Sequence, residues 1–451
     1  MTDRLNILVI MTDQQNGNAM SCVGSTDVAT PHQDRLAHEG VRFDRAYVAF
    51  PLCCPSRAAM ATGRWPHQIG AMTNGSSLTA DDIACSTGPL MRAAGYRTGW
   101  AGKWHVPNID MGKDAEIFGF QNVCGFSDTY LADACEAFLR QDHTQPFLLF
   151  ASFDNPHNIC EHGRDQVLPW GEVERDDDLP ANYPNLPFNH ARPAFEAKVL
   201  GDLRKGMPPQ QYGFTQERWR RFRHVYFRLC EKVDVEIGRL LAVLDDTGLA
   251  ENTVVIMLSD HGEHNGAHEL IQKSTSYEES VRVPFIVRLP EHVRNPRGRV
   301  TEAMVNTGLD LMPTLLDFAD APIPDGLDGL SVKPVVEERD PVWRDTLFVE
   351  SQMDKTDVQL RMLRTKHFKY TLFDRGQYRE MLFDLQNDPG ELVNLAVETR
   401  YADVLNAHRK QLHKWCLATG DTFGKHYSHA PYPVIPGVGY ARAPAREGLR
   451  G

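Results

Sequence analysis

Leu5-Asn-Ile-Leu-Val-Ile-Met11 is the first apolar run of this 451-residue chain, and Asp13 and Gln14 follow it almost at once. The run is too short for a signal-peptide core with a cleavage site, and no apolar run in the chain approaches the length that spans a bilayer. It is typical of a buried β-strand. We therefore predict a first strand here, and we expect a cytoplasmic protein without a membrane partner.

Comparable apolar runs recur along the chain and alternate with stretches of helical periodicity. The strands that they predict are Leu5–Met11, Arg97–Ala101, Phe147–Phe153, Val254–Leu258 and Pro284–Val287. The predicted helices are Pro55–Thr62, Gln216–Leu244 and Leu309–Phe318. Strands that alternate with helices are typical of an α/β domain, in which helices sandwich a mostly parallel sheet.

The pattern changes after about Pro334, where shorter runs predict a small antiparallel sheet and one helix. These elements are Thr346–Glu350, Val358–Leu363, Phe368–Leu372, Met381–Asp384 and Tyr401–Cys416. We therefore divide the chain into a main domain (1–340), a smaller α+β subdomain (341–420) and a tail (421–451). Residues 160–209 are rich in Pro, Asn and charge. A stretch this long without predicted structure is typical of a functional loop or lid.

The composition excludes several classes of protein. The 48 Lys and Arg residues against 60 Asp and Glu give a net charge of −12, without a basic block, which argues against nucleic-acid binding. A hydrophobic content of 42% is typical of a globular chain rather than a disordered one. The nine cysteines are an odd number without a paired spacing, so we expect reduced thiols.

Polar side chains follow four of the predicted strands, and the carboxyl ends of parallel strands meet at one edge of a sheet. We therefore expect a combined metal and anion site there. Its metal ligands would be Asp13, Gln14, Asp260 and His261. Oxygen ligands favour Ca²⁺ or Mg²⁺, and the imidazole leaves Mn²⁺ open. Its anion-binding side chains would be Arg57, Lys103, His105, His157 and Lys273.

Each of these residues also has an ordinary structural interpretation. Asp13 and Gln14 alone favour a helix N-cap or a loop carboxylate, and Lys273 alone favours a solvated surface charge. His105 and His157 taken singly favour structural hydrogen bonds. His264 and His268 lack the H-E-x-x-H spacing of a zinc helix, and we expect them to lie in a loop at the rim of the pocket.

The segment Pro51-Leu-Cys-Cys-Pro-Ser-Arg-Ala-Ala-Met-Ala-Thr-Gly-Arg64 is the most informative one. Pro55 suits the first position of a helix and Gly63 suits its end. Cys53 would then lie just before a helix N-terminus, where the dipole favours negative charge. A buried structural cysteine and a reactive thiol both fit this placement.

This segment resembles the C-x-P-S-R motif, followed by T-G-R, of the formylglycine-dependent type I sulfatases in the alkaline phosphatase superfamily. Gly95–His105 is similar to the family's second motif. The third region is matched by Ser259–Glu263 and Lys273–Pro284, and the C-terminal subdomain by Leu382–Glu391. The resemblance follows the family's order along nearly the whole chain, and it implies an alkaline-phosphatase-like fold.

The resemblance implies that a separate formylglycine-generating enzyme oxidises Cys53, and not Cys54, to formylglycine. The hydrate of this aldehyde would attack sulfur, and its second hydroxyl would then eliminate sulfate. One divalent cation, Ca²⁺ by expectation, would be bound by Asp13, Gln14, Asp260, His261 and the oxygen at position 53. Gln14 and His261 stand where many members carry Asp and Asn, so Mg²⁺ and Mn²⁺ stay open. Asp260 would also accept the proton of the attacking hydroxyl.

The remaining roles are implied in the same way. Arg57 and Lys103 would hold the hydrate and offset charge, and His105 would assist elimination. His157 and Lys273, together with Lys103, would bind sulfate oxygens, and His157 would protonate the leaving oxygen.

The expected function is hydrolysis of sulfate monoesters, with a small sulfated saccharide as the leading substrate. The 160–209 loop offers sugar contacts in Glu161, His162, Arg164 and Trp170. Phosphonate or phosphate ester hydrolysis at the same site is the alternative, because fold does not decide it. A non-catalytic anion-binding protein with an unmodified Cys53 is a minor alternative. The oligomeric state, including a homo-oligomer, stays open.

Overall fold

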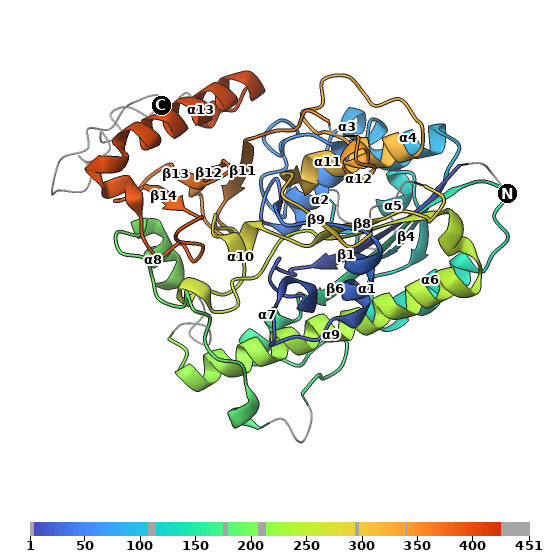
Figure 1. Cartoon of the computed structure of the whole chain (residues 1–451), viewed down its shortest axis with the longest axis horizontal. Helices are drawn as coiled ribbons and strands as arrows, with labels where there is room; N and C mark the ends of the chain where they lie inside the picture. Colours follow the sequence, from blue (N-terminus) through green and yellow to red (C-terminus); the bar gives the residue numbers. More distant parts are fainter. Residues whose placement is uncertain are drawn as a thin grey trace.

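The computed structural model describes residues 4–106, 114–174, 179–205, 213–293, 297–339 and 341–424. Most of the expected tail, residues 425–451, lies outside the described residues. The described part has an eight-stranded sheet between helices and a separate four-stranded sheet near its C-terminal end (Figure 1). Among these residues no helix combines the length and the apolar character needed to cross a membrane.

The large sheet has the strand order β5-β4-β6-β1-β7-β8-β2-β9. Its strands are β1 (Asn6–Asp13), β2 (Val41–Phe43), β4 (Arg97–Gly102), β5 (Gln121–Cys124), β6 (Phe147–Pro156), β7 (Thr253–Ser259), β8 (Phe285–Arg288) and β9 (Arg299–Thr301). The strand β8 runs antiparallel to both of its neighbours, β7 and β2, and the other paired strands of this sheet are parallel. This confirms the predicted mostly parallel α/β sheet.

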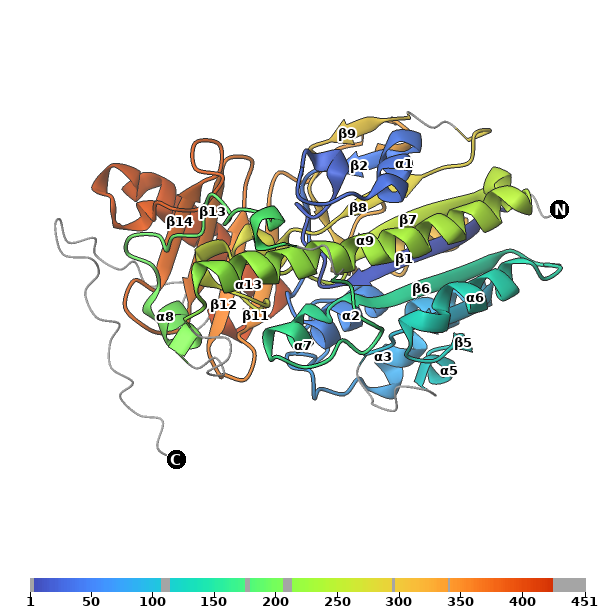
Figure 2. The same cartoon turned by 90° about the horizontal axis from the view of Figure 1, so that it is seen from below.

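The strand β1 shows why both faces of the sheet are covered. Ile7, Val9 and Met11 pack into one core, whereas Leu8 and Ile10 pack into the other. This alternation follows from the two-residue period of a strand. The first core includes helices α2 (Cys53–Thr62), α4 (Thr87–Ala93) and α11 (Thr307–Phe318), and the second includes α1 (Pro31–Glu39), α6 (Asp128–Leu139) and α9 (Gln216–Asp246). Figure 2 shows α9 crossing this second face.

The second sheet is antiparallel and has the order β11-β12-β13-β14. It consists of β11 (Leu347–Gln352), β12 (Gln359–Arg364), β13 (Phe368–Phe373) and β14 (Glu380–Asp384), and helix α13 (Ala402–Thr419) packs against it. This confirms the small antiparallel sheet expected there. The small sheet is joined to the main domain, because the backbone N–H of Glu350 on β11 donates at 3.0 Å to the carbonyl of Ala49, which lies in the segment just before α2.

Two expectations about local structure were wrong. Helix α2 begins at Cys53, two residues before Pro55, because the N–H of Ser56 already donates to the carbonyl of Leu52 at 2.9 Å. The 160–209 stretch is not structureless in its described part. It contains most of α7 (Ile159–Gly163) and all of α8 (Lys198–Lys205), and the N–H of Lys198 donates to the carbonyl of Gln377.

Candidate functional site

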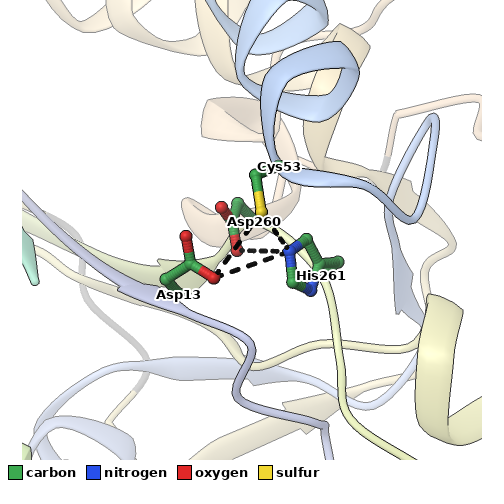
Figure 3. A group of neighbouring side chains, drawn as sticks. All are labelled: Asp13, Cys53, Asp260 and His261. Carbon is green, nitrogen blue, oxygen red and sulfur yellow. Dashed lines mark hydrogen bonds and ion pairs between the residues drawn. The ribbon is translucent and has the colours of Figure 1, made fainter. Parts of the chain in front are cut away.

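Four side chains meet where β1 and β7 end and α2 begins (Figure 3). They are Asp13, Cys53, Asp260 and His261, whose candidate ligand atoms all lie within 4.8 Å of one another. Asp13 ends β1, while Asp260 and His261 directly follow β7. Because β1 and β7 are parallel neighbours, their carboxyl ends deliver these side chains to one edge. We call these four residues the central group.

The thiol of Cys53 faces the other three side chains. Its Sγ lies 3.0 Å from His261 Nε2 and 3.9 Å from Asp13 Oδ1. Cys53 is 2% exposed, and Asp13 and His261 are fully buried. The placement at the first residue of α2 aims the side chain at the strand ends, which explains why the cysteine motif and the strand-end residues form one site.

Arg57 binds both carboxylates of the central group. Its Nε donates to Asp260 Oδ2 at 2.7 Å, and its Nη2 donates to Asp13 Oδ2 at 3.2 Å. Its Nη1 donates to Ser152 Oγ and to the Lys103 carbonyl, both at 2.9 Å. With its guanidinium fully buried and bonded in this way, Arg57 neutralises and orients the carboxylates.

Lys103 lies between two carboxylates. Its Nζ is 2.7 Å from Asp13 Oδ2 and 2.9 Å from Asp154 Oδ1. The other oxygen of Asp154 accepts from Trp170 Nε1 at 2.9 Å and from Asn158 Nδ2 at 2.7 Å. Asp154 therefore fixes the direction of the Lys103 side chain and connects it to the 160–174 segment.

The charges around Cys53 favour an anion at that position. Burial and Asp13 would raise the pKa of the Cys53 thiol, but Lys273, His261 and Lys103 together hold it well below its usual range. Burial would also raise the pKa of Asp13, but the adjacent cations, first among them Lys103, hold it well below its usual range.

The pKa values of the other two members of the central group, Asp260 and His261, are both raised. Burial and the Asp13 carboxylate raise the pKa of Asp260. Burial would lower the pKa of His261, but the Asp260 carboxylate outweighs it, so that this pKa is raised.

Both the oxygen and the nitrogen of the Gln14 side chain form hydrogen bonds. Its Oε1 accepts from Lys273 Nζ, while its Nε2 donates to Glu263 Oε2 at 2.5 Å and to Cys160 Sγ at 3.3 Å. Its backbone N–H donates to Asp260 Oδ1 at 3.2 Å. The structure therefore places the Gln14 carboxamide beside the central group, with its oxygen on Lys273.

The remaining predicted residues are less closely joined to the central group. His157 interacts electrostatically with Asp13 and Asp154. His105 is half-buried, and no hydrogen bond joins its side chain to the central group in the described part of the chain. Glu161 pairs with Arg164 at 3.4 Å. His162 lines a separate cavity of about 230 Å³ with Phe214 and Arg218, and the central group has no residue there.

Two histidines expected at the rim are buried instead. His264 is 1% exposed and His268 is fully buried, and Tyr277 packs against both rings. Burial lowers the pKa of His264 to about 3, so this ring is neutral near pH 7. Both residues support the loop after β7.

The donor set fits a hard divalent cation. Two carboxylates and one imidazole converge on the atom carried by residue 53, and Arg57 and Lys103 hold the carboxylate oxygens in place. With an oxygen in place of the Cys53 sulfur the set is oxygen-rich and suits Ca²⁺, Mg²⁺ or Mn²⁺. Asp13, Asp260, His261 and an oxygen on residue 53 would hold the ion.

Sequence reasoning did not assign three residues that organise the site, namely Asp154, Ser152 and Glu263. Asp154 and Ser152 lie on β6, and each binds a cation of the site. Asp154 could have been identified from the sequence, because it is an acidic residue directly after the apolar run Phe147–Phe153. Glu263 had no such signal, because its role comes from the folding of its loop against Gln14.

Comparisons with known proteins agree with one another. The model of the Sulfatase family matches residues 5–321, and that of the N-sulphoglucosamine sulphohydrolase C-terminal region matches residues 266–417. An arylsulfatase of Clostridium perfringens is 29% identical, over 91% of this chain and 94% of its own. A Δ4,5-hexuronate-2-O-sulfatase of Bacteroides thetaiotaomicron is 28% identical, over 93% and 90%. The solved structure of a 2-O GAG sulfatase is 26% identical, covers 94% of both chains and has a TM-score of 0.80.

Proposed function

The chain belongs to the sulfatase family and is a sulfuric ester hydrolase, and from this membership we propose that it hydrolyses sulfate monoesters carried by saccharides. The observation that carries this proposal is the central group itself. Side chains that could bind a metal ion surround residue 53, and Lys103 and Lys273 lie beside it. Lysines held this way suit a substrate that carries a sulfate group.

We propose further that a formylglycine-generating enzyme converts Cys53, whose hydrated aldehyde is then the nucleophile. Cys53 is the cysteine that faces Asp13 and His261, whereas the neighbouring Cys54 is not part of the central group. A bound divalent cation, Ca²⁺ in this proposal with Mg²⁺ and Mn²⁺ as alternatives, would polarise a sulfate oxygen and lower the pKa of the attacking hydroxyl.

The other side chains of this site have separate proposed roles. Arg57 keeps Asp13 and Asp260 in position, and Asp260 is the acceptor for the proton of the attacking hydroxyl. Lys103 and Lys273 bind sulfate oxygens and stabilise the charge that develops on them. His157 donates a proton to the leaving alcohol, and His105 assists elimination of sulfate.

A saccharide substrate is supported by the relatives. The Bacteroides thetaiotaomicron relatives include the hexuronate 2-O-sulfatase and an N-acetylglucosamine-6-O-sulfatase that is 26% identical over 89% of this chain. In this chain, Glu161 on α7 and the half-buried Trp170 follow β6 and are the proposed sugar contacts.

The test compares kcat/KM for a panel of sulfated mono- and disaccharides with that for an aryl sulfate, using protein made beside a formylglycine-generating enzyme. We expect at least one saccharide to exceed the aryl sulfate. Activity on the aryl sulfate alone would contradict the saccharide assignment. Phosphonate hydrolysis is the alternative reaction at the same site. Comparing kcat/KM for a sulfate ester and a phosphonate ester of the same leaving group separates the two reactions.

A further inference from the structure

The strand β6 forms a bulge at its carboxyl end, where it reaches the site. Met11 of β1 pairs with Ser152 of β6, but the next pair is Asp13 with Pro156, so residues 153–155 of β6 lie opposite a single residue of β1. The pairing of β6 with β4 also ends at Ser152. We call residues 153–155 the β6 bulge. Its backbone N–H groups need acceptors outside the sheet, because buried backbone N–H groups are nearly always bonded.

Asp128, the first residue of α6, supplies these acceptors. Its Oδ1 accepts from the backbone N–H of Asp154 at 2.7 Å. Its Oδ2 accepts from the backbone N–H of Asn155 at 2.8 Å and from Asn155 Nδ2 at 2.9 Å. All three residues are buried. Hydrogen bonds to an ionised carboxylate are among the strong ones, so Asp128 holds the β6 bulge firmly against α6.

The β6 bulge positions two side chains of the site. Asp154 Oδ1 lies 2.9 Å from Lys103 Nζ, and the Asp154 carbonyl accepts from the backbone N–H of His157 at 3.0 Å. The bonds to Asp128 therefore fix the backbone that carries the Asp154 carboxylate and on which the turn to His157 is built. Within the described part of the chain, no hydrogen bond joins Asp128 itself to Lys103 or His157, so its effect passes through residues 154 and 155.

We propose that Asp128 is a positioning residue of the sulfatase reaction, which sets the places of Lys103 and His157 by holding the β6 bulge. The inference rests on the proposed function, in which Lys103 binds sulfate oxygens and His157 donates a proton to the leaving alcohol. Asp128 touches neither the sulfate nor the reacting atoms in this account.

The proposed metal ligands are held by bonds that do not involve Asp128. Arg57 on α2 donates to Asp260 at 2.7 Å and to Asp13 at 3.2 Å. Loss of the Asp128 carboxylate should therefore weaken the binding of sulfate and slow turnover, while the response to the divalent cation changes little. This difference separates a positioning role from a general loosening of the fold.

The test measures kcat/KM on one sulfate ester and the inhibition constant, Ki, of inorganic sulfate, using matured protein. Asp128→Asn keeps the size of the side chain but replaces one acceptor oxygen by an NH2 group, which then faces an N–H donor. The value of kcat/KM should fall at least about 10-fold, and Ki should rise at least about fivefold. The Ca²⁺ concentration that gives half of the rise in melting temperature should stay within about threefold of wild type.

Two further variants accompany Asp128→Asn. Asp133→Asn is the matched control and should keep wild-type values, because Asp133 lies on the same helix, is 62% exposed and pairs with Arg239. Asn155→Ala removes one of the three bonds and leaves both backbone bonds, so kcat/KM should fall by about threefold. Melting temperatures show which variants fold, and Asn155→Ala decides the case if Asp128→Asn does not.

Wild-type kcat/KM and Ki in both Asp128→Asn and Asn155→Ala would overturn the proposal. A Ca²⁺ response that shifts as far as Ki would also overturn it, because Asp128 would then support the site as a whole. Failure of the proposed function would look different, since the wild-type protein itself would neither hydrolyse the ester nor bind sulfate, and this inference would fall with it.

Discussion

Two adjacent cysteines show how strongly one position in the fold changes the chemistry of a side chain. Burial and the neighbouring Cys53 raise the pKa of the Cys54 thiol to about 12, whereas the cations around Cys53 lower its pKa. Both residues lie at the start of α2, but the helix turns Cys53 toward the strand ends. The sequence motif marks the segment, and the structure shows which of its two sulfur atoms faces the metal-type ligands.

The first prediction concerns this pair. Cys53→Ala should lower kcat by at least about 1,000-fold, because it removes the nucleophile. Cys54→Ser is the matched control and should keep kcat within about threefold, since it changes a neighbour that does not react. The measurement is kcat on an aryl sulfate with matured protein. Equal losses in the two variants would contradict the assignment of Cys53.

The second prediction concerns Asp154. Asp154→Asn removes the carboxylate that holds Lys103 from β6, so kcat/KM should fall about 10- to 100-fold, as for other supporting side chains of a site. Trp170→Phe keeps the carboxylate and removes one donor to it, so its loss should be smaller. Steady-state kinetics of both variants on one sulfate ester provides the measurement. Wild-type kinetics in Asp154→Asn would mean that Asp13 alone positions Lys103.

At the scale of elements, strands and long helices were predictable because their side chains repeat with a fixed period. The long helix was expected at Gln216–Leu244 and is found at Gln216–Asp246, and the four strands near the C-terminus agree within two residues at each end. The edge strand β5 was not predicted, because it is short and partly exposed and so has weak periodicity. The helix over Asp128–Leu139 was missed although its buried side chains recur at helical spacing.

The site also had a part that could be predicted from the sequence and a part that could not. Strand-end residues could be placed together from sequence, because parallel strands bring their carboxyl ends to one edge. The bonds of Gln14 to Glu263 and Lys273 could not be anticipated, because they depend on how the loop after β7 folds back. The burial of His264 and His268 has the same origin.

The third prediction concerns a contact between the loop after α2 and the small sheet. His67 Nδ1 lies 2.8 Å from Glu350 Oε2 on β11, and its Nε2 is 3.2 Å from the Thr419 carbonyl. Burial would lower the pKa of His67, but the hydrogen bond and charge of Glu350 raise it above its usual value. A raised folded-state pKa stabilises the fold fully below the unfolded value of about 6.5, and this stabilisation is lost as pH rises through the folded value.

His67→Gln should therefore lower the melting temperature most below pH 6.5, by about 2 °C, and the difference from wild type should shrink at higher pH. Thermal melting of the two proteins between pH 5.5 and 9 provides the measurement. A difference that stays constant across this range would mean that His67 acts through packing against Trp65 and Trp415 and not through its charge.

At the scale of the whole molecule, the central group joins β1, α2 and the loop after β7, so an ion bound there should stabilise the entire fold. The fourth prediction is that chelator treatment lowers the melting temperature and that Ca²⁺ restores it. The stabilisation should grow by about 1.4 kcal/mol for each tenfold rise in free ion above its Kd. Parallel titrations with Mg²⁺ and Mn²⁺ identify the preferred ion.

Two variants control this experiment. Asp260→Asn removes the negative charge of a proposed ligand, so its response to the ion should shift to higher concentration. Asp357→Asn changes a side chain that is 80% exposed, pairs with Arg375 and is not part of the central group, and should respond like wild type. A melting temperature that no divalent cation changes would contradict the metal assignment.

The central claim is that residue 53 acts as a formylglycine, and the most direct measurement is tandem mass spectrometry of the tryptic peptide Ala46–Arg57. The protein should come from its native host or from cells that also express a formylglycine-generating enzyme. We predict that residue 53 carries an aldehyde oxygen in place of sulfur, while Cys54 stays a thiol. A peptide that retains both thiols under these conditions would contradict the proposed nucleophile, and the site would then have to act as an anion-binding pocket or through different metal-dependent chemistry.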